Sequence, residues 1–260
     1  MEIQSLLRAA RIAVIRATVL ARSVQSTLGR SDTLIKADAS PVTTADYGVQ
    51  AIISLSLRAH LGNAPFSLLA EESAATLRVA GGELLEAVVA AVNSAYPRST
   101  WAAERMVTEG NGDNAGSVTS WCAKDVLDAI DAGSLGDGAQ LPEAYWILDP
   151  IDGTKGFLRG GQYCVGLAYA ERGVPVIGVL GCPNLSYPAG MSANGNSLTA
   201  VGSLFSGWAG GQAFQEPLLA CSADAKDTAA RVPIAVSPAT TGADAIICES
   251  FEAGHSDHGR

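Results

Sequence analysis

The stretch Tyr145-Trp146-Ile147-Leu148-Asp149-Pro150-Ile151-Asp152-Gly153-Thr154 decides how this 260-residue chain should fold and what it can bind. Its first four residues form a short apolar run, which is typical of a buried strand. Two aspartates and a threonine follow within the next six residues, so we expect oxygen-bearing side chains at the end of that strand. Hard divalent cations such as Mg²⁺ prefer oxygen ligands and usually combine one or two carboxylates with substrate phosphates. The stretch is therefore a candidate Mg²⁺ site.

The residues around the two aspartates suit such a site. We expect Pro150 to stiffen a turn after the strand, so that the main-chain carbonyl of Ile151 lies between the two carboxylates. Gly153 lets the backbone pass close to an ion, and Thr154 adds a hydroxyl that can hold an attacking water. An Asp-Pro pair taken alone is more often an ordinary turn, so the assignment needs support from other segments.

Two segments nearer the N-terminus supply further carboxylates. The apolar run Phe66–Ala70 stops at Glu71-Glu72, which predicts a strand with two carboxylates at its end. Ser40 precedes a proline and is therefore not helical, so that Thr43 or Thr44 can cap a helix with Asp46 in its first turn. Each segment alone is more often a solvated surface, but their joint occurrence favours a shared site.

The rest of the chain predicts a layered α/β fold, in which helices and strands alternate irregularly. Helices are expected at 3–24, 45–61, 82–92 and 124–131. Strands are expected at 66–70, 145–148, 164–170, 174–180, 232–236 and 245–248, with a weaker pair within 198–214. The ranges 108–120 and 133–138 are expected to form loops.

Composition excludes several classes of function. The 26 Asp and Glu residues outnumber the 17 Lys and Arg residues, giving a formal net charge of −9 without any basic run. Nucleic acid is therefore not an expected partner, because non-specific binding depends on cations that neutralise phosphates. No apolar run approaches a membrane span, so no membrane partner is expected either. The five cysteines are too scattered for a disulfide framework or a zinc site.

Several motifs resemble one family of enzymes. Ser-Pro-Val-Thr-Thr-Ala-Asp (40–46), Ala-Glu-Glu-Ser (70–73) and Trp-Ile-Leu-Asp-Pro-Ile-Asp-Gly-Thr-Lys-Gly-Phe (146–157) resemble the lithium-sensitive, magnesium-dependent phosphatases related to inositol monophosphatase. The similarity is greatest to the 3′(2′),5′-bisphosphate nucleotidases. Thr-Lys-Gly-Phe-Leu-Arg-Gly (154–160) is typical of them, whereas inositol enzymes usually have Thr-x-Asn-Phe. The segments 178–184 and 249–258 also fit, and the resemblance covers essentially the whole chain.

The resemblance implies a fold and a set of site residues. The fold would be of the sugar-phosphatase, inositol monophosphatase-like type, with alternating helix and sheet layers. Two or three Mg²⁺ ions would be held by Glu71, Asp149, the Ile151 carbonyl and Asp152. The catalytic residues would be Asp46 and Thr154, the latter orienting or deprotonating the attacking water, and the substrate would be contacted by Thr154 and His255.

The resemblance also implies an activity, with alternatives. The chain would hydrolyse the 3′-phosphate of a small phosphorylated nucleotide, adenosine 3′,5′-bisphosphate, to give AMP. Its second substrate would be 3′-phosphoadenylyl sulfate. Water would attack in line without a phospho-enzyme, and Li⁺ would inhibit by occupying a Mg²⁺ position. One alternative is an inositol phosphate phosphatase on the same metal core, and another is an inactive fragment that acts as a binding partner.

The chain departs from the family pattern near its end. The nucleotidases continue with a Trp-Asp-His-Ala-Ala-Gly-type motif whose aspartate is a metal ligand, and no Trp-Asp occurs here. We therefore expect an N-terminal metal-binding catalytic domain over residues 1–230 and an incomplete C-terminal α/β domain over 231–260. The missing ligand motivates the inactive alternative. The absence of a Ser/Arg-rich leader favours the cytoplasm, with an organelle left open.

Overall fold

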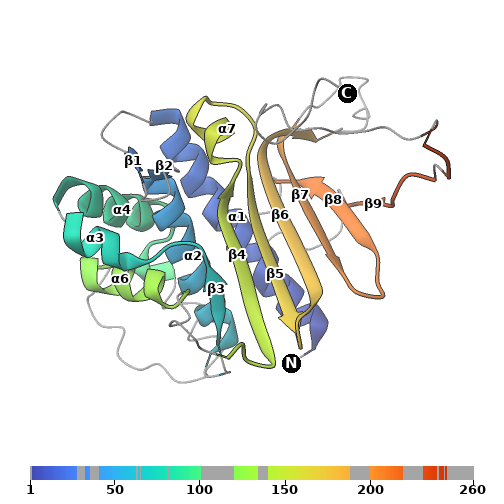
Figure 1. Cartoon of the computed structure of the whole chain (residues 1–260), viewed down its shortest axis with the longest axis horizontal. Coiled ribbons are helices and arrows are strands. Elements are labelled where there is room, and N and C mark those ends of the chain that lie inside the picture. The colour runs from blue at the N-terminus through green and yellow to red at the C-terminus, as the bar shows by residue number, and fades with distance from the viewer. Residues whose placement is uncertain are drawn as a thin grey trace.

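A seven-stranded sheet organises the structure (Figure 1). The computed structural model of the chain describes residues 2–27, 33–35, 41–62, 64, 66–80, 82–100, 120–133, 140–187, 200–218, 231–238, 240–242 and 244. The strand order follows the chain, and only the first pair, β3 and β4, is parallel. The strands are β3 (Leu68–Ala70), β4 (Ala144–Asp152), β5 (Cys164–Glu171), β6 (Val174–Tyr187), β7 (Ala200–Trp208), β8 (Ala213–Pro217) and β9 (Val232–Ile234).

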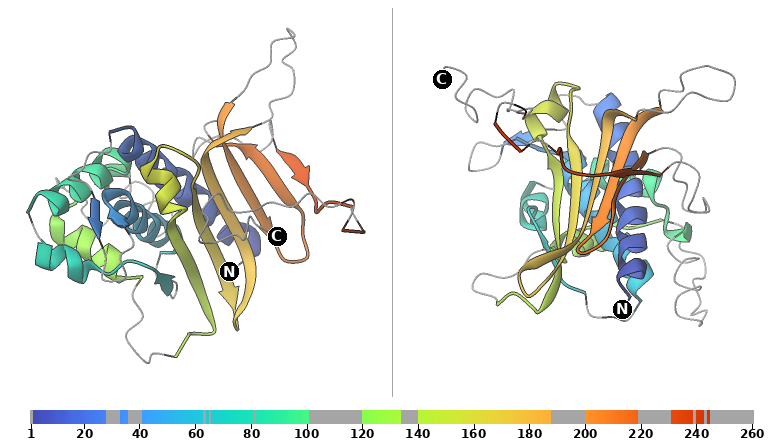
Figure 2. Two further views of the ribbon diagram at one scale, coloured as in Figure 1. Left: turned by 45° about the horizontal axis from the view of Figure 1, so that its top comes forward. Right: turned by 90° about the vertical axis from the view of Figure 1, so that its right-hand side faces the viewer.

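Two long helices cover one face of this sheet, and shorter helices pack behind them. Helix α1 lies along β5, β6 and β7, while α2 contacts α1, β4, α4 and α6 (Figure 2). The bounds are α1 (Ile3–Thr27), α2 (Thr44–Leu61), α3 (Ala74–Ala80), α4 (Gly82–Ala95), α6 (Ala123–Asp131) and α7 (Thr154–Leu158). The expected layered α/β architecture is confirmed.

The contact between α1 and β6 depends on a glycine. On β6, Gly181 faces the helix, where an added Cβ would lie 2.7 Å from Cγ1 of Val14 and 2.5 Å from Cγ2 of Thr18. The helix therefore packs closely against the strand, because β6 carries no side chain at the crossing.

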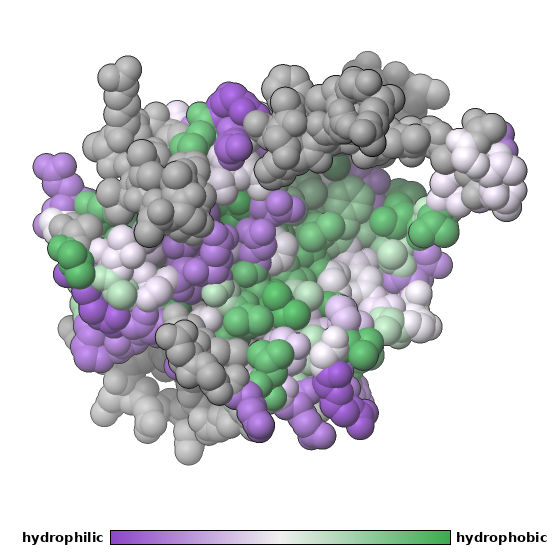
Figure 3. Space-filling model, viewed as in Figure 1, coloured by the Kyte–Doolittle hydropathy of each residue, from purple (hydrophilic) through white to green (hydrophobic). Residues whose placement is uncertain are grey.

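The opposite face of the sheet carries apolar residues that are only partly covered. Figure 3 shows them over the strands on the side turned to the viewer. Leu180 and Leu185 of β6 have exposed fractions of 45% and 40%. Side chains alternate along a strand, so Leu180 points away from α1, whereas Gly181 points toward it. The two faces of the sheet thus differ: one is sealed by α1 and the other is open at these positions.

The secondary structure agrees with the prediction in most elements and differs in a few. The helices and strands expected in the described ranges are present with shifted ends. The structure adds α3, α7 and a small antiparallel pair, β1 (Thr33–Ile35) with β2 (Pro41–Thr43), in segments whose composition is too polar or too short for a periodicity argument. The strand expected at 245–248 and most of the loop expected at 108–120 lie outside the described residues.

Two expectations about organisation keep their status as predictions. Strand β9 is hydrogen-bonded to β8 at the edge of the main sheet, and the proposed domain boundary at residue 230 immediately precedes it. That boundary stays a prediction, as does the compartment. In the described part of the chain, none of the helices is long and apolar enough to cross a membrane.

Candidate active site

A β-bulge places Asp149 and Asp152 on the same face of the sheet. In the register of β4 with β5, Asp149 lies opposite Gly166 and Asp152 lies opposite Cys164. Three steps along β4 therefore match two steps along β5, which means that β4 contains one extra residue. Asp152 Oδ2 is 3.7 Å from the Cys164 sulfur, and an added Cβ at Gly166 would lie 4.0 Å from the Cβ of Asp149. Both carboxylates are exposed on this face.

The prediction of a turn after Leu148 is wrong. Strand β4 continues to Asp152, and the buried residues Pro150 and Ile151 form the irregular part of the strand. Proline has no N–H to donate, so within a sheet it is tolerated where the ladder is already interrupted. Pro150 therefore marks a bulge in this chain, not the end of the strand.

The segment after the bulge is held tightly by backbone contacts. The hydroxyl of Thr154 donates a hydrogen bond to the carbonyl oxygen of Ile151 at 3.0 Å. Gly153 has φ = 90°, a left-handed conformation that strongly favours glycine. Gly156 packs against the carbonyl of Gln162 so closely that a Cβ would collide with it. Thr154 and the Ile151 carbonyl, both predicted site groups, are thus in direct contact.

Glu71 lies beside Asp149 at the end of β3. The parallel register pairs Ala70 with Leu148, and each carboxylate is the next residue along its strand. Glu71 is exposed, whereas Glu72 is buried. Because the carboxyl ends of parallel neighbours reach the same edge, this pairing brings a third predicted ligand to the open edge of the site.

Gln50 fixes the backbone that carries the two glutamates. Its Oε1 accepts a hydrogen bond from the N–H of Glu72 at 3.0 Å. Its Nε2 donates to the carbonyl of Glu72 at 2.8 Å and to the carbonyl of Ile130 at 2.7 Å. Gln50 is fully buried in α2, so one side chain joins α2, the end of β3 and the end of α6. This residue was not predicted from the sequence, although a glutamine beside the apolar positions Val49, Ile52 and Ile53 is a usable signal.

Asp46 lies in the first turn of α2, as predicted. It is buried, with an exposed fraction of 3%. It precedes Gln50 by one helical turn, so the two side chains lie on the same side of α2. A carboxylate in the first turn is stabilised by the helix dipole, which helps to explain how an acidic side chain is accommodated there.

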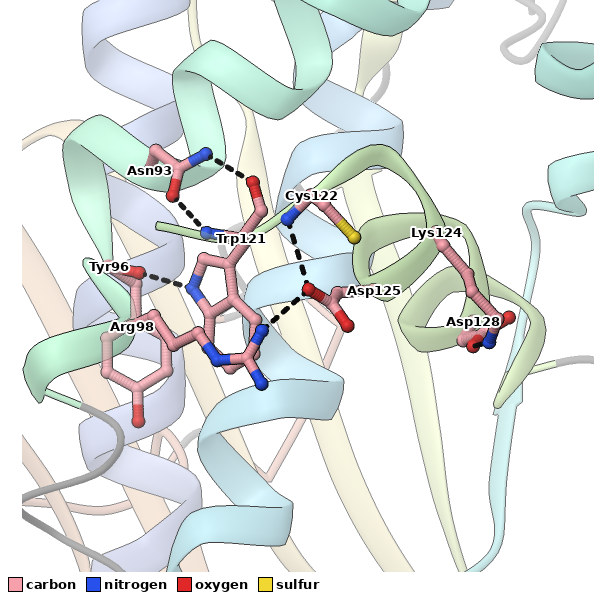
Figure 4. A network of polar contacts seen from close by, with 8 residues as sticks. All are labelled: Asn93, Tyr96, Arg98, Trp121, Cys122, Lys124, Asp125 and Asp128. Carbon is pink, nitrogen blue, oxygen red and sulfur yellow. Dashed lines mark hydrogen bonds and ion pairs between the residues drawn. The ribbon is translucent and has the colours of Figure 1, made fainter. Parts of the chain in front are cut away.

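Figure 4 shows a second polar network, which positions the start of α6. The other end of this helix is bound by Gln50. The side-chain amide of Asn93 binds the backbone of Trp121 twice: its Oδ1 accepts from the N–H at 2.6 Å, and its Nδ2 donates to the carbonyl at 3.0 Å. Asp125 receives hydrogen bonds from the N–H of Cys122 at 3.0 Å and from Arg98 at 2.8 Å. Partial burial opposes ionisation of Asp125, but these donors and the Arg98 charge outweigh it and lower the pKa of the carboxyl. The start of α6 is therefore attached to α4 and to the residues that follow α4.

Two cysteines that the sequence analysis treated as scattered thiols lie together at the site. Cys164 and Cys182 face each other on the neighbouring strands β5 and β6, since the adjacent residues Val165 and Gly181 lie opposite one another. The interaction between the two thiols, together with burial, raises the pKa of Cys164, and the same interaction lowers the pKa of Cys182. Strand pairing alone brings them together, so their spacing in the sequence carries no signal.

The predicted ligands share a region of the structure without forming a closed cluster. Over the residues that the structure describes, no three His, Cys, Asp or Glu side chains gather into a group able to hold a metal ion. His255 lies outside the described residues. The roles assigned to Asp46, Glu71, Asp149, Ile151, Asp152, Thr154 and His255 stay predictions.

Comparison with known proteins gives independent evidence. The model of the Inositol monophosphatase family matches residues 38–259. The 3′(2′),5′-bisphosphate nucleotidase 1 of Arabidopsis thaliana is 40% identical over 255 residues, which cover 97% of this chain and 66% of that protein. The 3′(2′),5′-bisphosphate nucleotidase of Oryza sativa is 38% identical over 254 residues, 96% of this chain and 64% of that protein.

A solved structure of a family member matches this chain with low similarity. CysQ from Bacteroides thetaiotaomicron, described as a bacterial member of the inositol monophosphatase family, shares 20% identity with a TM-score of 0.36, over 82% of this chain and 49% of that one. The chain spans about two thirds of the length of the two plant nucleotidases. The family match covers most of the chain, and it agrees with the predicted inositol monophosphatase-like architecture. This chain therefore belongs to the inositol monophosphatase family.

Proposed function

We propose that this chain is the metal-binding part of a Mg²⁺-dependent phosphatase that converts adenosine 3′,5′-bisphosphate to AMP and phosphate. The observation that carries the proposal is the bulge in β4, which turns Asp149 and Asp152 to one face of the sheet beside Glu71. The names of the plant relatives support a 3′(2′),5′-bisphosphate nucleotidase. The proposed second substrate is 3′-phosphoadenylyl sulfate, which carries the same 3′-phosphate.

The donor set fits a hard cation. Members of this family are generally metal-dependent. Glu71, Asp149 and Asp152 offer exposed carboxylates, and a carbonyl oxygen such as that of Ile151 has two lone pairs, of which Thr154 uses one. We assign two or three Mg²⁺ ions to these oxygens. When bound, such ions neutralise the phosphate, activate a water and stabilise the leaving alkoxide.

The remaining work falls to positioned side chains. The proton of the Thr154 hydroxyl is donated to Ile151, so the hydroxyl oxygen can accept a hydrogen bond from the attacking water. The buried carboxylate of Asp46 can accept a second one. Phosphoryl transfer needs mainly positioning and charge stabilisation from the protein, so no residue of the chain has to act as the nucleophile.

The backbone near Thr154 favours a nucleotide over an inositol phosphate. The inositol enzymes usually carry asparagine where this chain has Gly156. Any Cβ at this position would collide with the carbonyl of Gln162. The loop is therefore shaped for the Thr-Lys-Gly-Phe motif of the nucleotidases, and the inositol alternative requires a different backbone.

The test is an assay of phosphate release by the purified chain. We expect release from adenosine 3′,5′-bisphosphate that needs Mg²⁺, stops with a chelator and exceeds release from inositol monophosphate. Asp149→Asn should reduce turnover by roughly 100-fold or more, because a bound cation contributes several kcal/mol to the transition state. Asp128→Asn is the matched control, since Asp128 is exposed on α6 and pairs with Lys124.

Three other outcomes would overturn parts of the proposal. Near-normal turnover of Asp149→Asn would remove the metal-site assignment. Preference for inositol monophosphate would favour the alternative phosphatase. Uptake of Mg²⁺ in a calorimetric titration without phosphate release would favour the inactive binding partner over the enzyme.

A further inference from the structure

A row of polar side chains crosses β4, β5 and β6 at one level. Asp152 lies opposite Cys164, and Val165 lies opposite Gly181. In an antiparallel pair, the residue before Val165 then faces the residue after Gly181, which is Cys182. The 3.7 Å contact between the Cys164 sulfur and Oδ2 of Asp152 agrees with this register.

Both thiols point to the open face of the sheet. Gly181 faces Val14 and Thr18 of α1, so its neighbour Cys182 points away from the helix. Cys164 follows the same alternation, and its sulfur lies 3.7 Å from Oδ2 of Asp152 on that face. Both cysteines are partly exposed, so a small reagent can approach from the side that α1 does not cover.

The strand register places the two cysteines within the Cα separation of a disulfide. Opposite residues in an antiparallel pair have Cα atoms about 4.5 or 5.5 Å apart, depending on the type of pair. Disulfides span Cα separations of about 4.4–6.8 Å. The Cβ atoms of opposite residues are about 4.5–5.5 Å apart, whereas a disulfide needs about 3.5–4.5 Å. A bond between the sulfurs therefore requires a small approach of the two strands, and the resulting strain makes the bond easier to reduce.

We propose that Cys164 and Cys182 form a reversible cross-strand disulfide by exchange with a small disulfide such as oxidised glutathione. One thiolate attacks a glutathione sulfur, and a glutathione thiolate leaves to give a mixed disulfide. The second cysteine then attacks the protein-bound sulfur and releases the second glutathione. The two cysteines are oxidised, the glutathione disulfide is reduced to two thiols, and the two protons lost by the cysteines end on these thiols.

The bond changes the surroundings of Asp152. In the reduced protein the Cys164 thiol is its neighbour and hydrogen-bond donor. A sulfur in a disulfide has no proton to donate, so oxidation removes this donor and links β5 to β6. The proposal concerns the thiols alone and does not depend on the function proposed above.

Chemical mapping of the intact 260-residue protein tests the proposal. The folded protein is incubated with oxidised glutathione, quenched with N-ethylmaleimide, digested without reductant and analysed by mass spectrometry. We expect a peptide pair that joins Cys164 to Cys182, lost after treatment with dithiothreitol. All five cysteines are mapped, so a link from any of the others is recognised.

Single variants separate the two steps. With Cys164→Ser, we expect a glutathione adduct that persists on Cys182, because the resolving thiol is absent. Cys122→Ser is the control, since Cys122 is exposed on another part of the fold and should leave the cross-link unchanged. Persistent glutathione adducts or unmodified thiols at both positions of the folded wild-type protein would overturn the proposal without reference to any variant.

Discussion

The side-chain amide of Gln50 is hydrogen-bonded to both backbone groups of Glu72, at 3.0 and 2.8 Å. An amide side chain in this position acts as a short piece of neighbouring strand, because it offers one donor and one acceptor to the backbone of a single residue. Gly133 makes room for it, since an added Cβ there would lie 2.8 Å from Nε2 of Gln50. The end of β3, which carries Glu71, therefore depends on α2 for its conformation.

The first prediction concerns the stability that Gln50 provides. Gln50→Leu should lower the free energy of unfolding by about 2–4 kcal/mol, because it removes three buried hydrogen bonds to the backbone of Glu72 and Ile130. Urea unfolding followed by circular dichroism measures this. Gln212→Leu is the matched control, since the exposed Gln212 also donates to a backbone carbonyl, that of Ile234 at 2.9 Å. Equal losses for the two variants would contradict the prediction.

The second prediction tests the close contact between α1 and β6. Gly181→Ala should destabilise the protein by about 1–3 kcal/mol, because its Cβ would overlap Val14 and Thr18. Gly178→Ala is the control in the same strand, where nothing lies within 4 Å of the added Cβ, and it should be neutral or slightly stabilising. Thr18→Ser, which removes the contacting methyl group, should restore part of the stability of Gly181→Ala. Thermal unfolding of the wild type, Gly181→Ala, Gly178→Ala and the Gly181→Ala/Thr18→Ser double variant measures these differences in stability.

The third prediction concerns the loop after the bulge. Gly156→Asn should cost about 1–3 kcal/mol of stability, because its Cβ meets the Gln162 carbonyl, which belongs to the backbone and cannot simply turn aside. Gly160→Asn is the control, since Gly160 has φ = 70° with open space around it, and asparagine tolerates this conformation best after glycine. Guanidinium unfolding compares the two. A Gly156→Asn protein as stable as Gly160→Asn would show that the loop adapts.

The fourth prediction is a pH dependence at α6. The pKa of Asp125 lies below its usual value of 3.8 in the folded protein, so the unfolded chain takes up this proton first as the pH falls. The contribution of Asp125 to stability is therefore fully present above its usual pKa and is lost as the pH falls through the lowered one. Unfolding of wild type and Asp125→Asn between about pH 6 and pH 2.5 measures the difference in stability. That difference should shrink toward the acid end, and a constant difference would contradict the assignment.

Local patterns predicted much of the fold and part of the site. The apolar period of α1 and the cap before Asp46 depend on residues a few positions apart, so they can be recognised before any partner is known. The same is true of the carboxylates placed after apolar runs at Glu71 and Asp149. Partnerships were harder to predict, and Gln50 was missed because the groups it binds lie 22 and 80 residues away.

The sequence by itself determined which residues bear the oxygen ligands and which segments become helices and strands. Only the tertiary structure decided which way those ligands face. Side chains alternate along a regular strand, so Asp149 and Asp152, three residues apart, would point to opposite faces. The extra residue in β4 reverses that outcome, and it exists only relative to the register of β5. Strand pairing likewise brought Cys164 to Cys182, because a register is a property of two strands together and not of either one.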